Sequence, residues 1–170
     1  MITQQVLRLV DGCAHTGGMK RIEHVTDIDA DPATVWAVLA DVAAYPEWNP
    51  FLTIARLPER VGDRLDVTFT AGKRTTKIRP TVTVWEPGRT LCWKGTLGVP
   101  GIFDGAHELH VEPREGGGSR FVHRETFRGI LVPFVPGILR SADAGFAAMN
   151  AALKDRAEAR AATRAVPSSG

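Results

Sequence analysis

Hydrophobic and polar positions alternate at the start of the patterned part of the chain, and the period then becomes helical. One face of the period-two segment carries Ile22, His24, Thr26 and Ile28. This alternation predicts a strand. Asp31 and Pro32 then supply an N-cap and a first-turn proline, so a helix is expected at about 33–40. Its apolar surface is too wide for a helix that faces solvent. A second short helix is expected at 41–48.

Residues 51–127 carry short strand-forming runs separated by turns. The turns are expected at Val61-Gly62-Asp63, Ala71-Gly72-Lys73, Glu86-Pro87-Gly88 and 115–118. Between the turns, hydrophobic residues alternate at Leu65, Val67 and Phe69, at Leu91 and Trp93, at Leu109 and Val111, and at Phe121 and Phe127. Six strands fit in this region, and tight turns between consecutive strands predict an antiparallel meander with one buried face.

The helical period returns at Gly137 and continues almost to the end of the chain. One stripe of the predicted helix carries Leu139, Ala142, Phe146, Met149 and Leu153, and charged residues lie opposite. This helix is long enough to lie across the sheet.

An aromatic and proline cluster connects the first helices to the strands. Tyr45, Trp48 and Phe51 can bury a large apolar area, while Pro46 and Pro50 fix two backbone angles. The cluster is typical of a pinned bend between helix and sheet. It resembles the opening of the START-like, helix-grip (SRPBCC) superfamily.

Further segments extend this resemblance over about 21–159. The matching stretches are EPGRTLCWKG at 86–95, GIFDGAH at 101–107, FVHRETFRG at 121–129 and AMNAALK at 148–154. They look most like the bacterial branch labelled polyketide cyclase/dehydrase. The resemblance implies an α+β helix-grip fold, in which a curved antiparallel sheet of about seven strands and a long C-terminal helix enclose a cavity. Superfamily members include lipid carriers, hormone binders, aromatic-ring cyclases and oxygenase subunits, so the resemblance indicates fold more securely than reaction.

Length and charge predict one domain without a nucleic-acid partner. The chain has 170 residues and a net charge of +2, from 21 basic and 19 acidic residues spread along it. We expect a single domain at 19–160, a flexible leader at 1–18 and a C-terminal tail at 161–170. Met1 and Met19 are both candidate translation starts. No long basic block of the kind that binds nucleic acid is present.

Cysteine content and hydropathy favour the cytoplasm. Cys13 and Cys92 make a poor disulfide framework, which fits a reducing compartment. The longest nearly apolar stretch, 129–139, is far shorter than the roughly 20 residues that a membrane-spanning helix needs. No transmembrane segment is therefore expected, whereas peripheral contact with a membrane stays open, as does the oligomeric state. No cofactor is implied and no metal motif is present.

Three ionisable residues fall where the strand pattern predicts an inward, apolar face: His107, His123 and Glu125. A turn centred near Gly116 pairs residues whose numbers sum to about 232, which places His107 opposite Glu125 and Leu109 opposite His123. The two histidines would then be diagonal neighbours, roughly 7–8 Å apart at Cα.

Three interpretations of this cluster stay open. It is a satisfied His-Glu pair in the pocket wall, a site that orients a ligand, or a catalytic site in which His123, tuned by Glu125, abstracts a proton. Two histidines and a carboxylate also match a facial metal triad. However, no further ligand spacing is present, and members of the superfamily usually work without a metal.

A central cavity between sheet and helix would be lined by inward-facing side chains. The predicted ligand contacts are Trp93, Phe103, His107, Leu109, Phe121, His123, Glu125, Phe127, Phe134, Phe146, Met149, Asn150 and Leu153. Asn150 has an alternative role as a hydrogen-bonding residue in the helix packing seam. Arg79 is expected to face water.

Two connections, 97–103 and 129–137, are unusually apolar for loops. They are expected to meet at the cavity mouth, either as a plug at the end of the core or as a hydrophobic portal. The favoured function is binding of a small hydrophobic molecule, aromatic, polyketide-like or lipid. The alternatives are a cyclase or dehydratase that uses the His/Glu cluster, and an accessory module that docks on an enzyme complex or a membrane.

Overall fold

A computed structural model describes residues 18–71 and 74–165. Three expected features lie wholly or partly outside these ranges: the leader except Gly18, Gly72 and Lys73 of the expected turn, and the last five residues of the expected tail. The strands are β1 (Gly18–Ile28), β2 (Leu52–Ile54), β3 (Val67–Ala71), β4 (Arg74–Ile78), β5 (Thr81–Glu86), β6 (Thr90–Thr96), β7 (Asp104–Pro113) and β8 (Ser119–Gly129). The helices are α2 (Pro32–Ala40), η2 (Val42–Ala44), α3 (Tyr45–Trp48), η3 (Val132–Phe134) and α4 (Pro136–Ala165).

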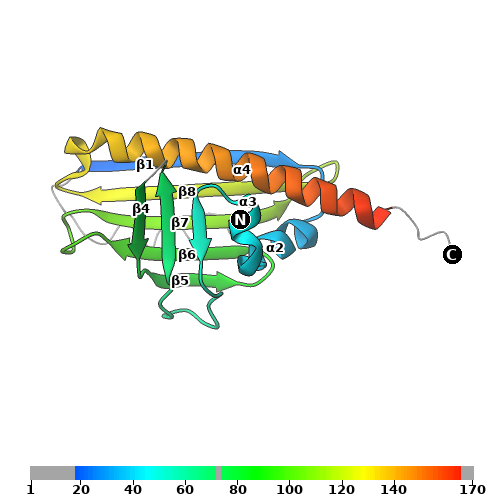
Figure 1. Cartoon of the computed structure of the whole chain (residues 1–170), viewed down its shortest axis with the longest axis horizontal. Helices are drawn as coiled ribbons and strands as arrows, with labels where there is room; N and C mark the ends of the chain where they lie inside the picture. The colour runs from blue at the N-terminus through cyan, green and yellow to red at the C-terminus, as the bar shows by residue number, and fades with distance from the viewer. Residues whose placement is uncertain (1–17, 72–73, 166–170) are drawn as a thin grey trace.

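The strands form an antiparallel sheet of five, in the order β1-β8-β7-β6-β5, and a smaller sheet of three, β2-β3-β4. In Figure 1 the strands of the small sheet run across those of the large one, and α4 extends along the β1 edge. The predicted α+β helix-grip fold is confirmed. The strand count differs slightly, because β2 has only three residues and carries too little periodicity to be recognised in the sequence.

The helix start and the aromatic bend form as the residue types predict. The Asp31 side chain accepts a hydrogen bond from the Thr34 amide at 3.0 Å, and Pro32 occupies the first turn. The buried Tyr45 hydroxyl donates to the Leu39 carbonyl oxygen at 2.7 Å. Asn49 Oδ1 then accepts hydrogen bonds from the backbone amides of Phe51 and Leu52, and these bonds turn the chain into β2.

The register of β7 on β8 is the predicted one. His107 pairs with Glu125 and Leu109 pairs with His123. The tight connection at 116–118 consists of three glycines with positive φ, and only glycine adopts such angles at no steric cost. A turn of fixed length therefore sets the register along both strands.

The helix α4 packs its apolar stripe on the large sheet. Four of the five predicted stripe residues are buried, namely Ala142, Phe146, Met149 and Leu153. They share one core with the inward residues of the sheet, including Trp93, Leu109 and Phe121. The helix runs to Ala165, so residues 161–165, which were expected in the tail, are helical. Arg79 is exposed and pairs with Asp66 at 2.9 Å.

Candidate functional site

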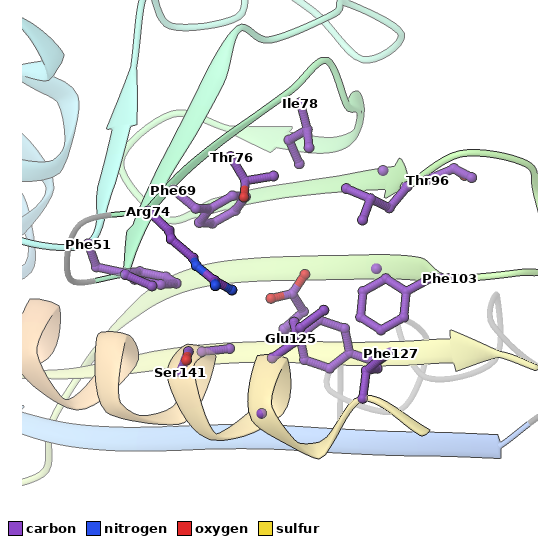
Figure 2. A pocket seen from close by; sticks show the side chains of 18 of the residues that line it. Phe51, Phe69, Arg74, Thr76, Ile78, Thr96, Phe103, Glu125, Phe127 and Ser141 are labelled. Carbon is purple, nitrogen blue, oxygen red and sulfur yellow. The ribbon is translucent and has the colours of Figure 1, made fainter. Parts of the chain in front are cut away.

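A cavity of about 630 Å³ lies between the β3–β4 hairpin, the large sheet and the first turns of α4. Most of its wall is apolar, with aromatic rings from Phe51, Phe69, Trp93, Phe103, Phe127 and Phe134. The polar side chains on the wall come from Arg74, Thr76, Thr96, Glu125 and Ser141. Figure 2 shows the Glu125 carboxyl among apolar side chains, with Arg74 extending from β4 towards it.

The predicted ligand contacts divide into two groups. Five line the cavity: Trp93, Phe103, Glu125, Phe127 and Phe134. The structure places the other eight in the core beyond the wall, against the expectation that they face the ligand: His107, Leu109, Phe121, His123, Phe146, Met149, Asn150 and Leu153. The physical reason is that α4 packs directly on this half of the sheet, so Phe146 and Met149 fill the space that was expected to be open.

Glu125 is the one residue of the predicted ionisable cluster that reaches the cavity. Its side chain is 11 % exposed, and burial raises the pKa of this carboxyl to about 8. It is therefore protonated at neutral pH. Gly105 makes room for it, because a Cβ at that position would lie 2.6 Å from Glu125 Oε1. The site thus needs glycine on β7 for space rather than for backbone conformation.

The two histidines form a buried layer behind the cavity. His107 stacks on Trp93 at 4.3 Å between ring centroids, and His123 stacks on Phe146 at 3.7 Å. Burial lowers the pKa of His107 to about 3, and burial together with neighbouring His107 lowers the pKa of His123 well below its ordinary value. Both imidazoles are therefore neutral at pH 7, each with one N–H and one acceptor nitrogen.

The contacts of Asn150 set the tautomer of each ring. Asn150 Nδ2 donates to Thr26 Oγ1 at 3.0 Å, so its Oδ1 accepts from His123 Nδ1 at 2.8 Å. His123 Nε2 then has no hydrogen and accepts from His107 Nε2 at 2.9 Å. This leaves His107 Nδ1 as an acceptor without a hydrogen bond, 3.4 Å from Glu125 Oε2. The proton of a neutral Glu125 is the donor nearest to it.

Several cavity residues were missed in the sequence, above all Arg74. Residues at alternate positions of β4, Arg74, Thr76 and Ile78, all line the cavity. The same period-two rule that predicted the other strands would have found them. The segment is polar, and Ile78 is the only hydrophobic residue on its inward face, so the hydrophobic alternation that marked the other strands is absent here.

No metal centre is evident in the part of the chain that the structure describes. No group of three or more histidine, cysteine, aspartate or glutamate side chains there is arranged to hold a metal ion. Likewise, none of the described helices is both long and apolar enough to cross a membrane. Cys92 is a buried free thiol, and burial raises its pKa to about 12.

Comparison with known proteins assigns the chain to a family. The family model described as "Polyketide cyclase / dehydrase and lipid transport" matches residues 19–160. The chain belongs to this family. The predicted resemblance is therefore confirmed, and the matched range has the same bounds as the region in which we expected the single domain. A search among curated proteins finds no match.

Solved structures with low sequence identity share the fold. The di-domain aromatase/cyclase BexL, from the BE-7585A biosynthetic pathway, is 13% identical with a TM-score of 0.65; the match covers 82% of this chain and 50% of BexL. This chain therefore spans about half of BexL.

Two further structures match over nearly their whole length. The Zhui aromatase/cyclase from Streptomyces sp. R1128 is 16% identical with a TM-score of 0.62, over 90% of this chain and 99% of Zhui. A point mutant of norcoclaurine synthase from Thalictrum is 19% identical with a TM-score of 0.61, over 86% of this chain and 98% of that one. At such identities these likenesses establish the common fold and not a common reaction.

Proposed function

We propose that this protein binds a small hydrophobic molecule, aromatic, polyketide-like or lipid, in the cavity. The observation that carries this proposal is a cavity of about 630 Å³ with a mostly apolar wall and a few polar side chains. Ligand pockets of roughly 300–1,000 Å³ with this composition accommodate drug-sized molecules. The family, whose description includes both polyketide cyclase and lipid transport, supports the same class of ligand.

The polar end of the ligand would lie between Arg74 and Glu125. The Arg74 side chain makes no hydrogen bond or ion pair with any other residue in the described ranges, and it points into the cavity (Figure 2). A guanidinium is a donor only, and a neutral carboxyl offers one donor and one acceptor. An apolar molecule that ends in a carboxylate, an enolate or a carbonyl oxygen matches this pair.

Titration with two fluorescent probes of similar size, one anionic and one neutral, tests the ligand class. Arg74→Gln should weaken binding of the anionic probe about tenfold, since hydrogen bonds to charged groups contribute roughly 1.5–3 kcal/mol, and leave the neutral probe unaffected. Lys77→Gln is the matched control, because Lys77 lies on the same strand outside the cavity wall. If the wild type binds neither probe and native mass spectrometry finds no retained molecule, the cavity does not bind hydrophobic ligands.

A second function, acid-base catalysis of the cyclase or dehydratase type, is favoured by the state of Glu125. A cavity carboxyl with a pKa of about 8 can release and regain a proton near neutral pH. Because His107 and His123 lie behind the wall, Glu125 is the one member of the cluster that would contact the substrate. Glu125→Gln should then lower turnover of a polyketide-like substrate by roughly 100- to 10,000-fold and leave binding largely intact. Equal turnover in both proteins would eliminate this function.

We also propose a cytoplasmic location. The buried free thiol of Cys92 supports it, because reducing compartments keep such thiols unpaired.

A further inference from the structure

Exposed hydrophobic side chains gather at one end of the molecule. Among the described residues, nine large hydrophobic side chains are exposed. Seven of them form what we call the apolar end: Met19, Leu97, Val99, Ile130, Leu131, Phe134 and Ile138. Phe134 is 77 % exposed and Val99 61 % exposed. The other two, Val25 and Val61, lie singly elsewhere.

The segments of the apolar end are joined into one surface. Ile130 N donates to the Gly101 carbonyl oxygen at 3.2 Å, and Leu131 N donates to the Ile102 carbonyl oxygen at 3.1 Å. The start of β1 adjoins them, because Gly18 pairs with Gly129 and a Cβ on Gly18 would meet the Pro133 ring. Hydrophobic residues from three distant parts of the sequence therefore form a single patch rather than scattered contacts.

The cavity opens through this patch. Leu97, Phe134 and Ile138 are exposed and also line the cavity. The sequence had predicted that loops 97–103 and 129–137 meet at the mouth, and the backbone hydrogen bonds between them confirm that they meet.

Charge differs between the two ends of the large sheet. At the apolar end, segments 18–22, 94–104 and 126–141 contain five basic residues, Lys20, Arg21, Lys94, Arg128 and Arg140, and one acid, Asp104. The Asp104 carboxylate accepts a hydrogen bond from the Gly101 amide at 2.8 Å. Just beyond these segments, Glu23 forms an ion pair with Arg21. Five bases against two acids leave this end with a net positive charge.

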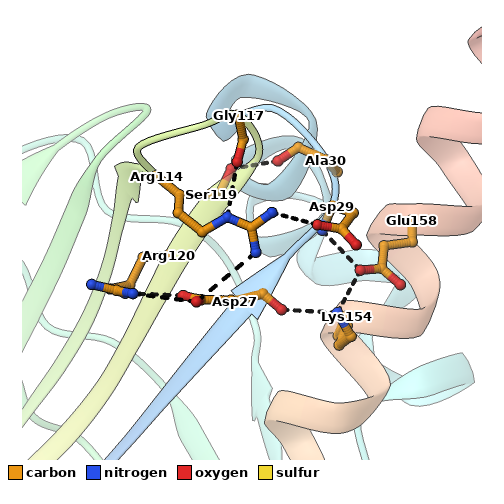
Figure 3. A network of polar contacts seen from close by, with 9 residues as sticks. All are labelled: Asp27, Asp29, Ala30, Arg114, Gly117, Ser119, Arg120, Lys154 and Glu158. Carbon is orange, nitrogen blue, oxygen red and sulfur yellow. Dashed lines mark hydrogen bonds and ion pairs between the residues drawn. The ribbon is translucent and has the colours of Figure 1, made fainter.

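At the opposite end, where β1 finishes and β8 begins, the surface is polar. Segments 26–32 and 112–120 contain five acids, Asp27, Asp29, Asp31, Glu112 and Glu115, against two bases, Arg114 and Arg120. Figure 3 shows how some of them join a network with α4. The Asp27 carboxylate accepts a hydrogen bond from Arg120 Nε at 2.9 Å, and Lys154 Nζ donates to the Asp27 carbonyl oxygen and to Glu158. From α4, Lys154, Glu158 and Arg164 also contact this end. With them the end carries six acids against four bases, so its charge is only weakly negative, and none of its described residues is an exposed large hydrophobic one.

We propose that the apolar end docks on an anionic membrane surface, with the cavity mouth facing the lipid. Hydrophobic side chains would enter the interface while the surrounding basic residues attract lipid headgroups. The opposite end, which is weakly negative and lacks exposed hydrophobic side chains, would not be attracted, so the two differences together orient the molecule. A soluble protein partner would not require basic residues around an apolar centre, and this combination favours a membrane over such a partner. This inference goes beyond ligand binding, because it concerns the outer surface around the cavity mouth and what that surface contacts.

Flotation of the full chain with vesicles tests the proposal. Phosphatidylcholine vesicles that contain phosphatidylglycerol should bind the protein, and vesicles of phosphatidylcholine alone should bind it weakly. Joint replacement of Val99→Ser and Ile130→Ser should weaken binding by at least roughly tenfold, since each buried side chain contributes substantially. Neither residue lines the cavity, so probe binding in free solution should not change. Val25→Ser with Val61→Ser is the matched control and should bind as the wild type does.

Charge reversal at the same end provides an independent test. Lys20→Glu with Arg140→Glu should reduce binding to the anionic vesicles by roughly tenfold or more, because each basic residue near such a surface contributes about a fivefold factor. Arg56→Glu with Arg160→Glu changes the net charge equally elsewhere and should have a smaller effect.

Three outcomes would overturn the proposal: no vesicle binding by the wild type, equal losses in test and control pairs, or self-association in sedimentation that Val99→Ser with Ile130→Ser abolishes. The third would assign the surface to a second copy of the chain. If the wild type binds the hydrophobic probe but not the vesicles, membrane docking is refuted and the proposed function stands. If the wild type binds the vesicles but not the probe, the proposed function is refuted and docking stands.

Discussion

At the scale of single residues, Glu125 and the two buried histidines make stability depend on pH in opposite directions. The carboxyl titrates near 4.5 in the unfolded chain and at about 8 in the folded protein, so the folded state binds more protons across this window. Stability contributed by the neutral carboxyl therefore falls as pH rises through it. His107 and His123 act in the opposite direction, because their folded pKa values lie below the ordinary 6.5. Their contribution grows as pH rises towards 6.5.

These opposing terms predict a maximum of stability near pH 6.5. Between pH 6.5 and 8 the wild type should lose roughly 1–2 kcal/mol of unfolding free energy, from one proton at about 1.4 kcal/mol per pH unit. Glu125→Gln keeps the shape and removes this loss, so its stability should stay level over the same range. Urea unfolding at several pH values measures both proteins. An equal decline in the two would show that another group is responsible.

The tautomers of the buried histidines give a second prediction at this scale. His107 should carry its hydrogen on Nε2 and His123 on Nδ1, because Asn150 accepts from His123 and each ring is neutral. Nitrogen-15 chemical shifts of the two rings distinguish these forms directly. Asn150→Leu removes the acceptor for His123 and should cost about 1–3 kcal/mol of stability. A hydrogen on His123 Nε2 in the wild type would contradict the hydrogen-bond order.

At the scale of elements, α4 contacts the aromatic bend through a glycine. A Cβ on Gly145 would overlap the Phe51 ring, whereas a Cβ on Gly137 in the same helix would meet open space. Phe51 itself packs on Phe69 and Phe146. The helix can therefore close over the small sheet only where it lacks a side chain.

Alanine substitutions at the two glycines should accordingly have opposite effects. Gly145→Ala should destabilise the protein by roughly 1–3 kcal/mol through overpacking, despite the better helix propensity of alanine. Gly137→Ala should be neutral or stabilising by up to about 1 kcal/mol. Thermal unfolding of the two variants checks the pair. Equal stability would mean that the Phe51 ring moves away at little cost.

At the scale of the whole molecule, the cavity mouth and the exposed hydrophobic surface coincide at Phe134. Phe134→Ser should therefore change the association and dissociation rates of a hydrophobic probe more than their ratio, because a gate alters the barrier and not the bound state. Phe134→Leu, which keeps a bulky apolar group, should preserve the rates. Stopped-flow fluorescence measures them, and unchanged rates in Phe134→Ser would exclude a gating role.

The sequence alone determined most of the elements, their order and the pairing of β7 with β8. Local chemistry specifies these features: Asp31 caps a helix wherever the chain folds, and consecutive glycines at 116–118 permit one short turn that fixes the register. The alternating pattern also identified the inward face, so His107, His123 and Glu125 were correctly placed on one side of the sheet.

Only the tertiary structure decided which of these inward residues reach the cavity. Alternation shows which face of the sheet a residue lies on. It does not show where along the strand the sheet is covered by another element and where a cavity is left. Here α4 covers the half of the sheet that carries His123 and Leu109, and the β3–β4 hairpin stands away from the half that carries Glu125 and Phe127. The neutral state of Glu125 and the entry of Arg74 into the cavity arise from that packing, because burial and distance between strands far apart in sequence have no local signal.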